Sequence, residues 1–208
     1  MILMYSRIIL SIVVTLIAWS SKAQDTPAIL SYHVACDSIY LNKNYHVTLA
    51  TLDSTNEDDS TPNTLFSVSR LSGKQYLQIF SDSLFSKTGN VEFADFNNDR
   101  IPDILVQNIS DVRSNSTYYL YLVDTINNRI KKIEGFEAIK NPVYLPQYDL
   151  ISNYVMSGKT WTSFYKIQGD TIKDFDIVIY DNQANDSSYD RDYRKAIQSI
   201  LKREPKRR

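Results

Sequence analysis

Residues 91–106 read VEFADFNNDRIPDILV, and this stretch decides how the rest of the chain is interpreted. Oxygen-bearing side chains fall at positions 1, 3, 5 and 9 of a loop within it: Asp95, Asn97, Asp99 and Asp103. Alternate residues of a tight loop turn their oxygens inward, and the backbone carbonyl of Ile101 supplies position 7. The spacing therefore predicts a site for one hard cation, Ca²⁺, within residues 95–103.

The crowding of three carboxylates in nine residues favours a bound cation. Two carboxylates about 4 Å apart repel each other by roughly 1 to 4 kcal/mol, depending on the local dielectric. A divalent cation would turn this repulsion into attraction. A turn whose Asp and Asn side chains hydrogen-bond only to the loop backbone is the alternative interpretation of the same residues.

The residues after the loop distinguish it from a helix–loop–helix calcium hand. Position 12 is Val106, where such a hand carries a bidentate Glu. The loop also leaves into the apolar run Ile104-Leu105-Val106, which is typical of a β-strand. The sequence therefore predicts strand, cation loop, strand.

This arrangement resembles the calcium loop of FG-GAP and VCBS-type repeats, which reads Asp-x-Asn-x-Asp-Gly-x-x-Asp before a short apolar strand. The chain departs from that pattern at Arg100, where the repeats carry Gly. Gly at this point supplies a positive φ, and a left-handed conformation costs any other residue about 1 to 2 kcal/mol. We find one copy of the loop, so the sequence does not predict an array of identical repeats.

The N-terminus has the three parts of a secretory signal peptide. Arg7 precedes an apolar segment from Ile8 to Trp19, and Ser21-Lys22-Ala23 places small residues before a cut at Gln24. The apolar segment is too short to span a bilayer core of about 30 Å, so no stable membrane anchor is expected, although a retained anchor is the alternative. We therefore expect residues 1–23 to be removed and the protein to be exported, to the periplasm or beyond.

Composition limits the partners that the exported chain can have. Loss of Arg7 and Lys22 reduces 23 basic residues to 21, against 24 acidic residues, for a net charge of −3. Nothing in this balance favours a nucleic-acid partner. Hydrophobic residues make up 43% of the sequence, enough for one core, and 15 tyrosines favour sheets and a binding face. Residues 24–201 are predicted to form a single β-rich domain, followed by a basic tail, 202–208.

Short strand-like segments joined by turns follow one another along the domain. The fold is therefore expected to be all-β, an antiparallel meander that forms a propeller-like assembly or a curved sandwich, with one short C-terminal helix. A type I′ turn is predicted at Asn127-Asn128, and Asn141-Pro142 and Leu145-Pro146 are predicted to mark a loop. The predicted strands are 46–50, 66–69, 75–80, 104–106, 118–123, 129–133, 149–156, 160–167 and 172–180.

The C-terminal helix is predicted from apolar residues at helical spacing. Asp190 or Asp192 is expected to cap its N-terminus. Its apolar face is expected to comprise Tyr193, Ala196, Ile197, Ile200 and Leu201.

The order of segments over residues 65–180 resembles a family of exported bacterial proteins with one calcium loop in a propeller-like β fold. The segments that carry the resemblance, besides the loop, include Ser72-Gly73-Lys74, Tyr121-Leu122-Val123-Asp124 and Lys166-Ile167-Gln168-Gly169. Characterised members inhibit peptidoglycan-cleaving enzymes or confer immunity against them. The resemblance implies a protein partner of the lysozyme-like hydrolase class, and only the calcium loop is specific.

Three classes of function are compatible with these features. The first is an exported calcium-binding, non-catalytic binding protein that inhibits a peptidoglycan hydrolase; the alternative is an FG-GAP-like adhesion or structural surface module. The third, an enzyme, is not expected, because His33, His46 and Cys36 carry no local signature of a cysteine hydrolase. We expect surface histidines and a buried, inert cysteine. No spacing of acidic residues indicates a catalytic carboxylate pair.

Overall fold

The structure, a computed structural model, describes residues 29–36, 38–52, 61–181 and 186–204. The expected signal peptide, 1–23, and the acidic segment 53–60 lie outside the described residues. The chain folds into three antiparallel four-stranded sheets followed by a helix, which confirms the all-β meander with one C-terminal helix.

Strands adjacent in the sequence are neighbours in every sheet. The first sheet contains β1 (Ile29–Ala35), β2 (Tyr45–Leu52), β3 (Thr64–Ser72) and β4 (Gln75–Leu84). The second contains β5 (Val91–Ala94), β6 (Asp103–Ser110), β7 (Ser116–Asp124) and β8 (Arg129–Ile133). The third contains β9 (Val143–Leu145), β10 (Leu150–Ser152), β11 (Trp161–Gln168) and β12 (Thr171–Tyr180). A 3₁₀ turn, η1 (Phe136–Ala138), joins the second sheet to the third, and α1 (Asp186–Arg203) ends the domain.

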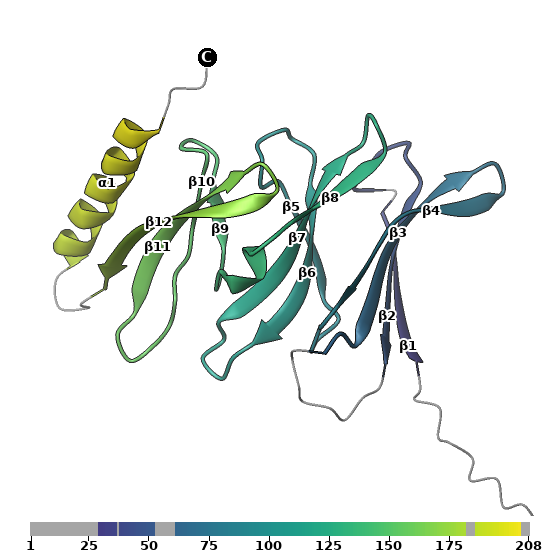
Figure 1. The fold of residues 1–208 in the computed structure, drawn as a ribbon, viewed down its shortest axis with the longest axis horizontal. Coiled ribbons are helices and arrows are strands. Elements are labelled where there is room, and N and C mark those ends of the chain that lie inside the picture. Colours follow the sequence, from purple (N-terminus) through teal and green to yellow (C-terminus); the bar gives the residue numbers. More distant parts are fainter. Residues whose placement is uncertain (1–28, 37, 53–60, 182–185, 205–208) are drawn as a thin grey trace, which may run out of the picture.

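The three sheets stand in a row, with α1 covering the far side of the third (Figure 1). One apolar cluster joins the first sheet to the second, with Phe66 against Tyr121 at 4.4 Å between ring centres. A second cluster packs Leu105 and Leu120 of the second sheet with Phe136 of η1 and Ile151 of the third sheet. A third cluster lies between the third sheet and α1. Four-stranded meanders packed face to face are the unit of a propeller, although the described sheets form an open row.

The second sheet is buried on both faces because it lies between the other two. Ile104 and Val106 belong to the cluster shared with the first sheet, whereas Leu105 belongs to the cluster shared with the third. Burial of each such side chain contributes about 1.5 to 3 kcal/mol. The runs of apolar residues in β6 and β7 fit this burial on both faces of the sheet.

The helix differs from its prediction at both ends. It begins at Asp186, so Asp190 and Asp192 are not its caps, and it continues through Arg203, beyond the predicted domain end at residue 201. Ala196, Ile197 and Ile200 are buried as expected, but Leu201 is 42% exposed. Eight residues after Tyr193, Leu201 has turned about 80° away from it, at 3.6 residues per turn. The helices of the described residues do not combine the length and apolar character needed to cross a membrane.

Three strands and one turn were not predicted correctly. The predicted strand 149–156 is confined to β10, Leu150–Ser152. β1 was missed, and β9 was predicted as a loop because Pro142 and Pro146 flank it; edge strands tolerate proline, and β9 is an edge strand. The predicted type I′ turn is wrong, because it needs positive φ at two residues and Asn127 does not have it, whereas Asn128 has a φ of 53°. The Asp124 carboxylate holds this turn by accepting the N–H groups of residues 126 and 127.

Candidate metal site

The predicted cation loop lies between β5 and β6 of the second sheet. Ala94 and Asp103 are paired across the two strands, which closes the loop at its base. The prediction of strand, loop, strand is therefore confirmed. Tyr40 also holds the loop, because its hydroxyl donates to the carbonyl of Pro102 at 2.7 Å.

The Asp95 carboxylate organises the first half of the loop. Its Oδ1 accepts the backbone N–H groups of Asn97 at 3.1 Å and Asn98 at 2.6 Å. Its Oδ2 accepts the N–H of Arg100 at 2.8 Å. Three backbone donors therefore converge on one side chain, which fixes the loop around position 1.

Asn97 and Asp99 continue this pattern. The Oδ1 of Asn97 accepts the N–H of Asp99 at 3.0 Å, and the Oδ1 of Asp99 accepts the N–H of Ile101 at 2.7 Å. The Nδ2 of Asn97 also donates to the Oδ2 of Asp99 at 3.0 Å. These are successive Asx turns, the arrangement that the alternative interpretation of the sequence describes.

Asp103 differs from the other three oxygen-bearing residues because it is fully buried. Its Oδ2 accepts the N–H of Phe96 at 2.8 Å, and its Oδ1 accepts the N–H of Val123 at 3.0 Å. Burial raises the pKa of this carboxyl to about 7, and the charges of Asp99 and Asp95 act in the same direction, against the two backbone hydrogen bonds. Asp103 thus ties the base of the loop to β7.

The backbone at Arg100 has the conformation expected of a glycine. Its φ is 68°, in the left-handed region, as the resemblance to the glycine-bearing loop implied. The guanidinium side chain is exposed at the tip of the loop. The loop therefore has a left-handed residue at the position where the repeat pattern carries glycine, and it presents a positive charge there.

Replacing Arg100 with Gly should stabilise the protein. The left-handed conformation costs Arg about 1 to 2 kcal/mol, and Gly adopts it without this cost. Gly is also more flexible in the unfolded chain, which cancels about 0.5 to 1 kcal/mol of that gain in stability. We expect Arg100→Gly to raise the free energy of unfolding by about 0.5 to 1 kcal/mol in urea denaturation. Asn98→Gly, at a φ of 61°, is the matched control and should gain less, because Asn tolerates this conformation. Equal stability of Arg100→Gly and wild type would mean that the loop carries no such strain.

The structure brings the predicted ligands into one loop but does not arrange them around a single point. Asp95, Asn97 and Asp99 face the N–H groups of the loop, and Asp103 faces Phe96 and Val123. Among the described residues, no three His, Cys, Asp or Glu side chains form a group able to hold a metal ion. A carboxylate oxygen has two lone pairs, so acceptance of an N–H leaves capacity for a cation. Calcium binding thus stays a prediction.

Two large hollows border the loop. One, of about 550 Å³, combines apolar side chains with side chains of both charges; it is lined by Asn97, Asp99, Leu122, Val123, Asp124, Arg129, Ile130 and Lys131. The other, of about 460 Å³, includes Asp95, Phe96, Glu92, Tyr118 and Tyr144 among its lining residues. No motif in the sequence predicted a functional role for the β8 side chains of the first hollow, Arg129, Ile130 and Lys131. Alternation of charged and apolar residues from Arg129 to Lys131 indicates that this strand lies at a surface.

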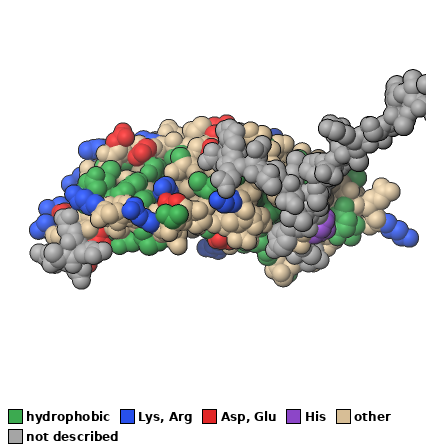
Figure 2. Space-filling model, turned by 90° about the horizontal axis from the view of Figure 1, so that it is seen from below, with side chains coloured by type: hydrophobic (Ala, Val, Ile, Leu, Met, Phe, Trp, Pro, Cys, Tyr) green, Lys and Arg blue, Asp and Glu red, His purple; other side chains and the backbone are tan. Residues whose placement is uncertain are grey.

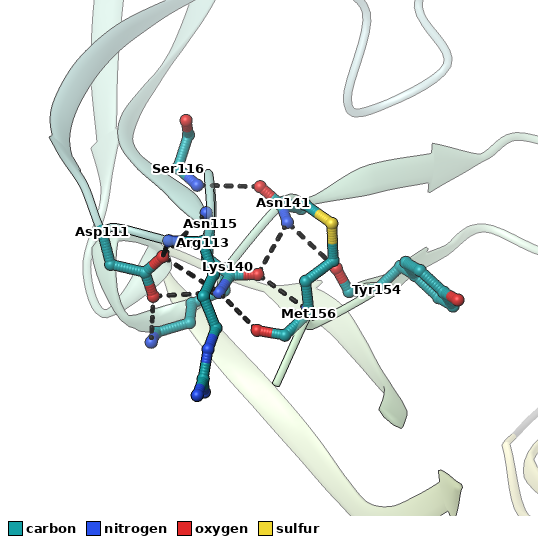
Figure 3. Close-up of polar contacts among 8 residues, drawn as sticks. All are labelled: Asp111, Arg113, Asn115, Ser116, Lys140, Asn141, Tyr154 and Met156. Atoms are coloured by element: carbon teal, nitrogen blue, oxygen red, sulfur yellow. Dashed lines mark hydrogen bonds and ion pairs between the residues drawn. The ribbon is translucent and has the colours of Figure 1, made fainter. Parts of the chain in front are cut away.

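A second concentration of polar contacts lies where the second and third sheets meet (Figure 3). Asn115, only 2% exposed, donates from Nδ2 to both oxygens of Asp111 and to the carbonyl of Met156. Its Oδ1 accepts the N–H of Met156 at 2.8 Å and the Nδ2 of Asn141 at 3.1 Å. Lys140 pairs with Asp111 at 3.1 Å. Every side-chain hydrogen-bonding group of Asn115 is thereby satisfied, which identifies a structural connection rather than a ligand site.

Comparisons of the chain with protein-family models, curated proteins and solved structures found no match. The resemblance to calcium-loop inhibitors therefore rests on the residues quoted above. The two histidines and the cysteine have the positions expected of them: His33 is exposed, His46 is partly exposed, and Cys36 is buried.

Proposed function

We propose that this protein is an exported, calcium-binding, non-catalytic binding protein that inhibits a peptidoglycan-cleaving hydrolase. The observation that carries the proposal is the loop of residues 95–103, in which the oxygens of Asp95, Asn97 and Asp99 occupy alternate positions around a backbone with the left-handed turn of a calcium loop. With Asp103, the four predicted side-chain ligands all offer oxygen, the ligand that Ca²⁺ prefers. One ligand is a neutral Asn and Arg100 adds positive charge, so we expect weak affinity, with a dissociation constant of about 10⁻⁴ to 10⁻³ M.

The surroundings of the loop favour a protein partner. The loop borders two hollows that combine apolar and charged side chains. It is fixed at its base by the buried Asp103 and by the hydroxyl of Tyr40. A loop that is already ordered avoids a cost of about 0.5 to 1.5 kcal/mol for each side chain that would otherwise be immobilised on binding.

Inhibition would proceed by plugging the cleft of the enzyme. Glycoside hydrolases cleave their substrates with a pair of carboxyl groups, so their clefts are negatively charged. Arg100 is exposed at the tip of the rigid loop, and a guanidinium group binds a carboxylate through two parallel hydrogen bonds. The loop would thus enter the cleft, Arg100 would face a catalytic carboxylate, and substrate would be excluded. Calcium would act indirectly, by keeping the loop in shape.

The proposal is tested by cell-wall lysis with a panel of lysozymes and other peptidoglycan hydrolases, with and without calcium. Wild type is expected to block lysis by at least one enzyme. Arg100→Gly should inhibit more than tenfold less well although it is the more stable protein, and Arg100→Lys should be intermediate because Lys cannot form the bidentate pair.

Three outcomes would contradict parts of the proposal. If lysis is undiminished across the panel and no partner protein is found, the adhesion or structural module becomes the favoured function in place of the inhibitor. Hydrolysis of a glycan or peptide by the purified protein would refute a non-catalytic role. Mass spectrometry of the protein from culture supernatant or periplasm that finds residues 1–23 retained would contradict export by a cleaved signal peptide.

A further inference from the structure

The two histidines of the chain lie side by side on the first sheet, away from the candidate loop. His33 is on β1 and His46 is on β2, and their ring centres are 5.4 Å apart with an angle of 30° between the ring planes. His33 on β1 is paired with Thr48 on β2, and His46 lies two residues before Thr48 on the same strand. Both histidines therefore project from the same face of the sheet.

That face is the one turned away from the second sheet. Val34 and Val47, the neighbours of His33 and His46 on their strands, pack into the core between the first and second sheets. The histidines alternate with them and point outward, where His33 is exposed and His46 is partly exposed. Figure 2 shows histidine atoms at the surface at this end of the molecule. A solvent ion can therefore reach the pair.

The separation of the rings matches a shared metal ion. Zn–N bonds are about 2.0 to 2.1 Å long, so two imidazoles on one tetrahedral zinc ion have their centres about 5 Å apart. The observed 5.4 Å between the ring centres is close to this value. The small angle between the two ring planes is also compatible with a shared zinc ion. The only condition is that each metal–nitrogen bond lies in the plane of its own ring.

The contact of His33 with Thr48 leaves one nitrogen of that ring for the metal. The Nδ1 of His33 lies 3.3 Å from the hydroxyl of Thr48, so a hydrogen bond there orients the ring and leaves Nε2 available. Metal-binding histidines characteristically make such a bond with their second nitrogen. The ring of Tyr76 packs against His46, with centres 5.2 Å apart, and restricts its orientation from the other side.

We propose that His33 and His46 together bind one first-row divalent cation of the kind that prefers imidazole, represented by Zn²⁺. Two protein ligands leave the remaining positions to water, so the site is open. It differs in chemistry from the candidate loop, which offers only oxygen to a hard cation. Calcium in excess should not compete for the histidine pair.

The test is a zinc titration of untagged protein in excess calcium, followed by competition with a chromophoric zinc chelator. We expect one zinc ion per chain in wild type. His33→Gln and His46→Gln should each weaken binding at least tenfold, and Thr48→Val should weaken it less. Asp95→Ala, which alters the oxygen loop, should leave zinc affinity unchanged.

A measurement on the wild-type protein tests the two histidine ligands without relying on the variants. Cu²⁺ binds nitrogen sites more strongly than Zn²⁺ does, and its electron paramagnetic resonance spectrum reports the nitrogens bound to it. Superhyperfine splitting from two imidazole nitrogens is expected at one equivalent of Cu²⁺. A spectrum without two such nitrogens, or zinc affinity equal to wild type in both histidine variants, would overturn the proposal.

Discussion

Calcium at ten times its dissociation constant is expected to raise the free energy of unfolding by about 1.4 kcal/mol, and Asp95→Ala is expected to abolish this gain. The gain arises because an ion that binds only the folded loop shifts the equilibrium by mass action. For a domain of this size it corresponds to a rise in melting temperature of about 3 to 5 °C. The measurement is thermal unfolding of wild type and variant in chelator and in excess calcium.

The control for Asp95→Ala separates loss of the ion from loss of a turn. Asp95 accepts three backbone N–H groups, so its removal should also lower stability in chelator. Asp174→Ala removes an exposed carboxylate that accepts a local N–H, that of Asp176, on β12 of the third sheet. Asp174→Ala should keep the full response to calcium. A wild-type melting temperature identical in chelator and in calcium would leave only the hydrogen-bonded Asx turn.

The candidate loop could be predicted from the sequence because its determinants are local. Asp95, Asn97 and Asp99 contact backbone groups two to five residues away, so alternate spacing is enough to indicate the turn. The same spacing predicted Asp103 as a ligand equivalent to these three residues. Its burial and its bond to Val123, 20 residues further along the chain, depend on how β6 and β7 pair, and no local pattern encodes that.

The fold, like the candidate loop, could be predicted where its determinants are local in the sequence. Alternation and turn residues identified most strands of the meander, since neighbours in the sequence are neighbours in each sheet. Stacking of sheets into a row depends on contacts between residues far apart, such as Phe66 with Tyr121, and could only be expected in outline. The short β9 was missed because its flanking prolines are a stronger local signal than three strand residues.

Asn115→Ala is expected to destabilise the protein by about 2 to 4 kcal/mol, which is the largest effect that we predict for a single side chain. The substitution leaves the N–H and the carbonyl of Met156 without their 2.8 Å partners. It also removes the Nδ2 group that contacts both carboxylate oxygens of Asp111. Each such group left unsatisfied in a partly buried place costs about 1 to 3 kcal/mol. Urea denaturation measures the loss. Arg113→Ala, an exposed neighbour in the same loop, is the matched control and should change stability by less than about 0.5 kcal/mol.

Acidification provides an independent check of the same network. Hydrogen bonds from the Asn115 side chain, then from its backbone N–H, hold the pKa of Asp111 well below its usual range, with Lys140 contributing. A folded-state pKa below the unfolded value of about 3.9 means that the stabilisation is present above that pH and is lost as the pH falls. Wild type should therefore lose stability between about pH 4 and pH 2, and Asn115→Ala should lose less of it over the same range. An equal loss in both proteins would show that Asp111 is not stabilised through Asn115.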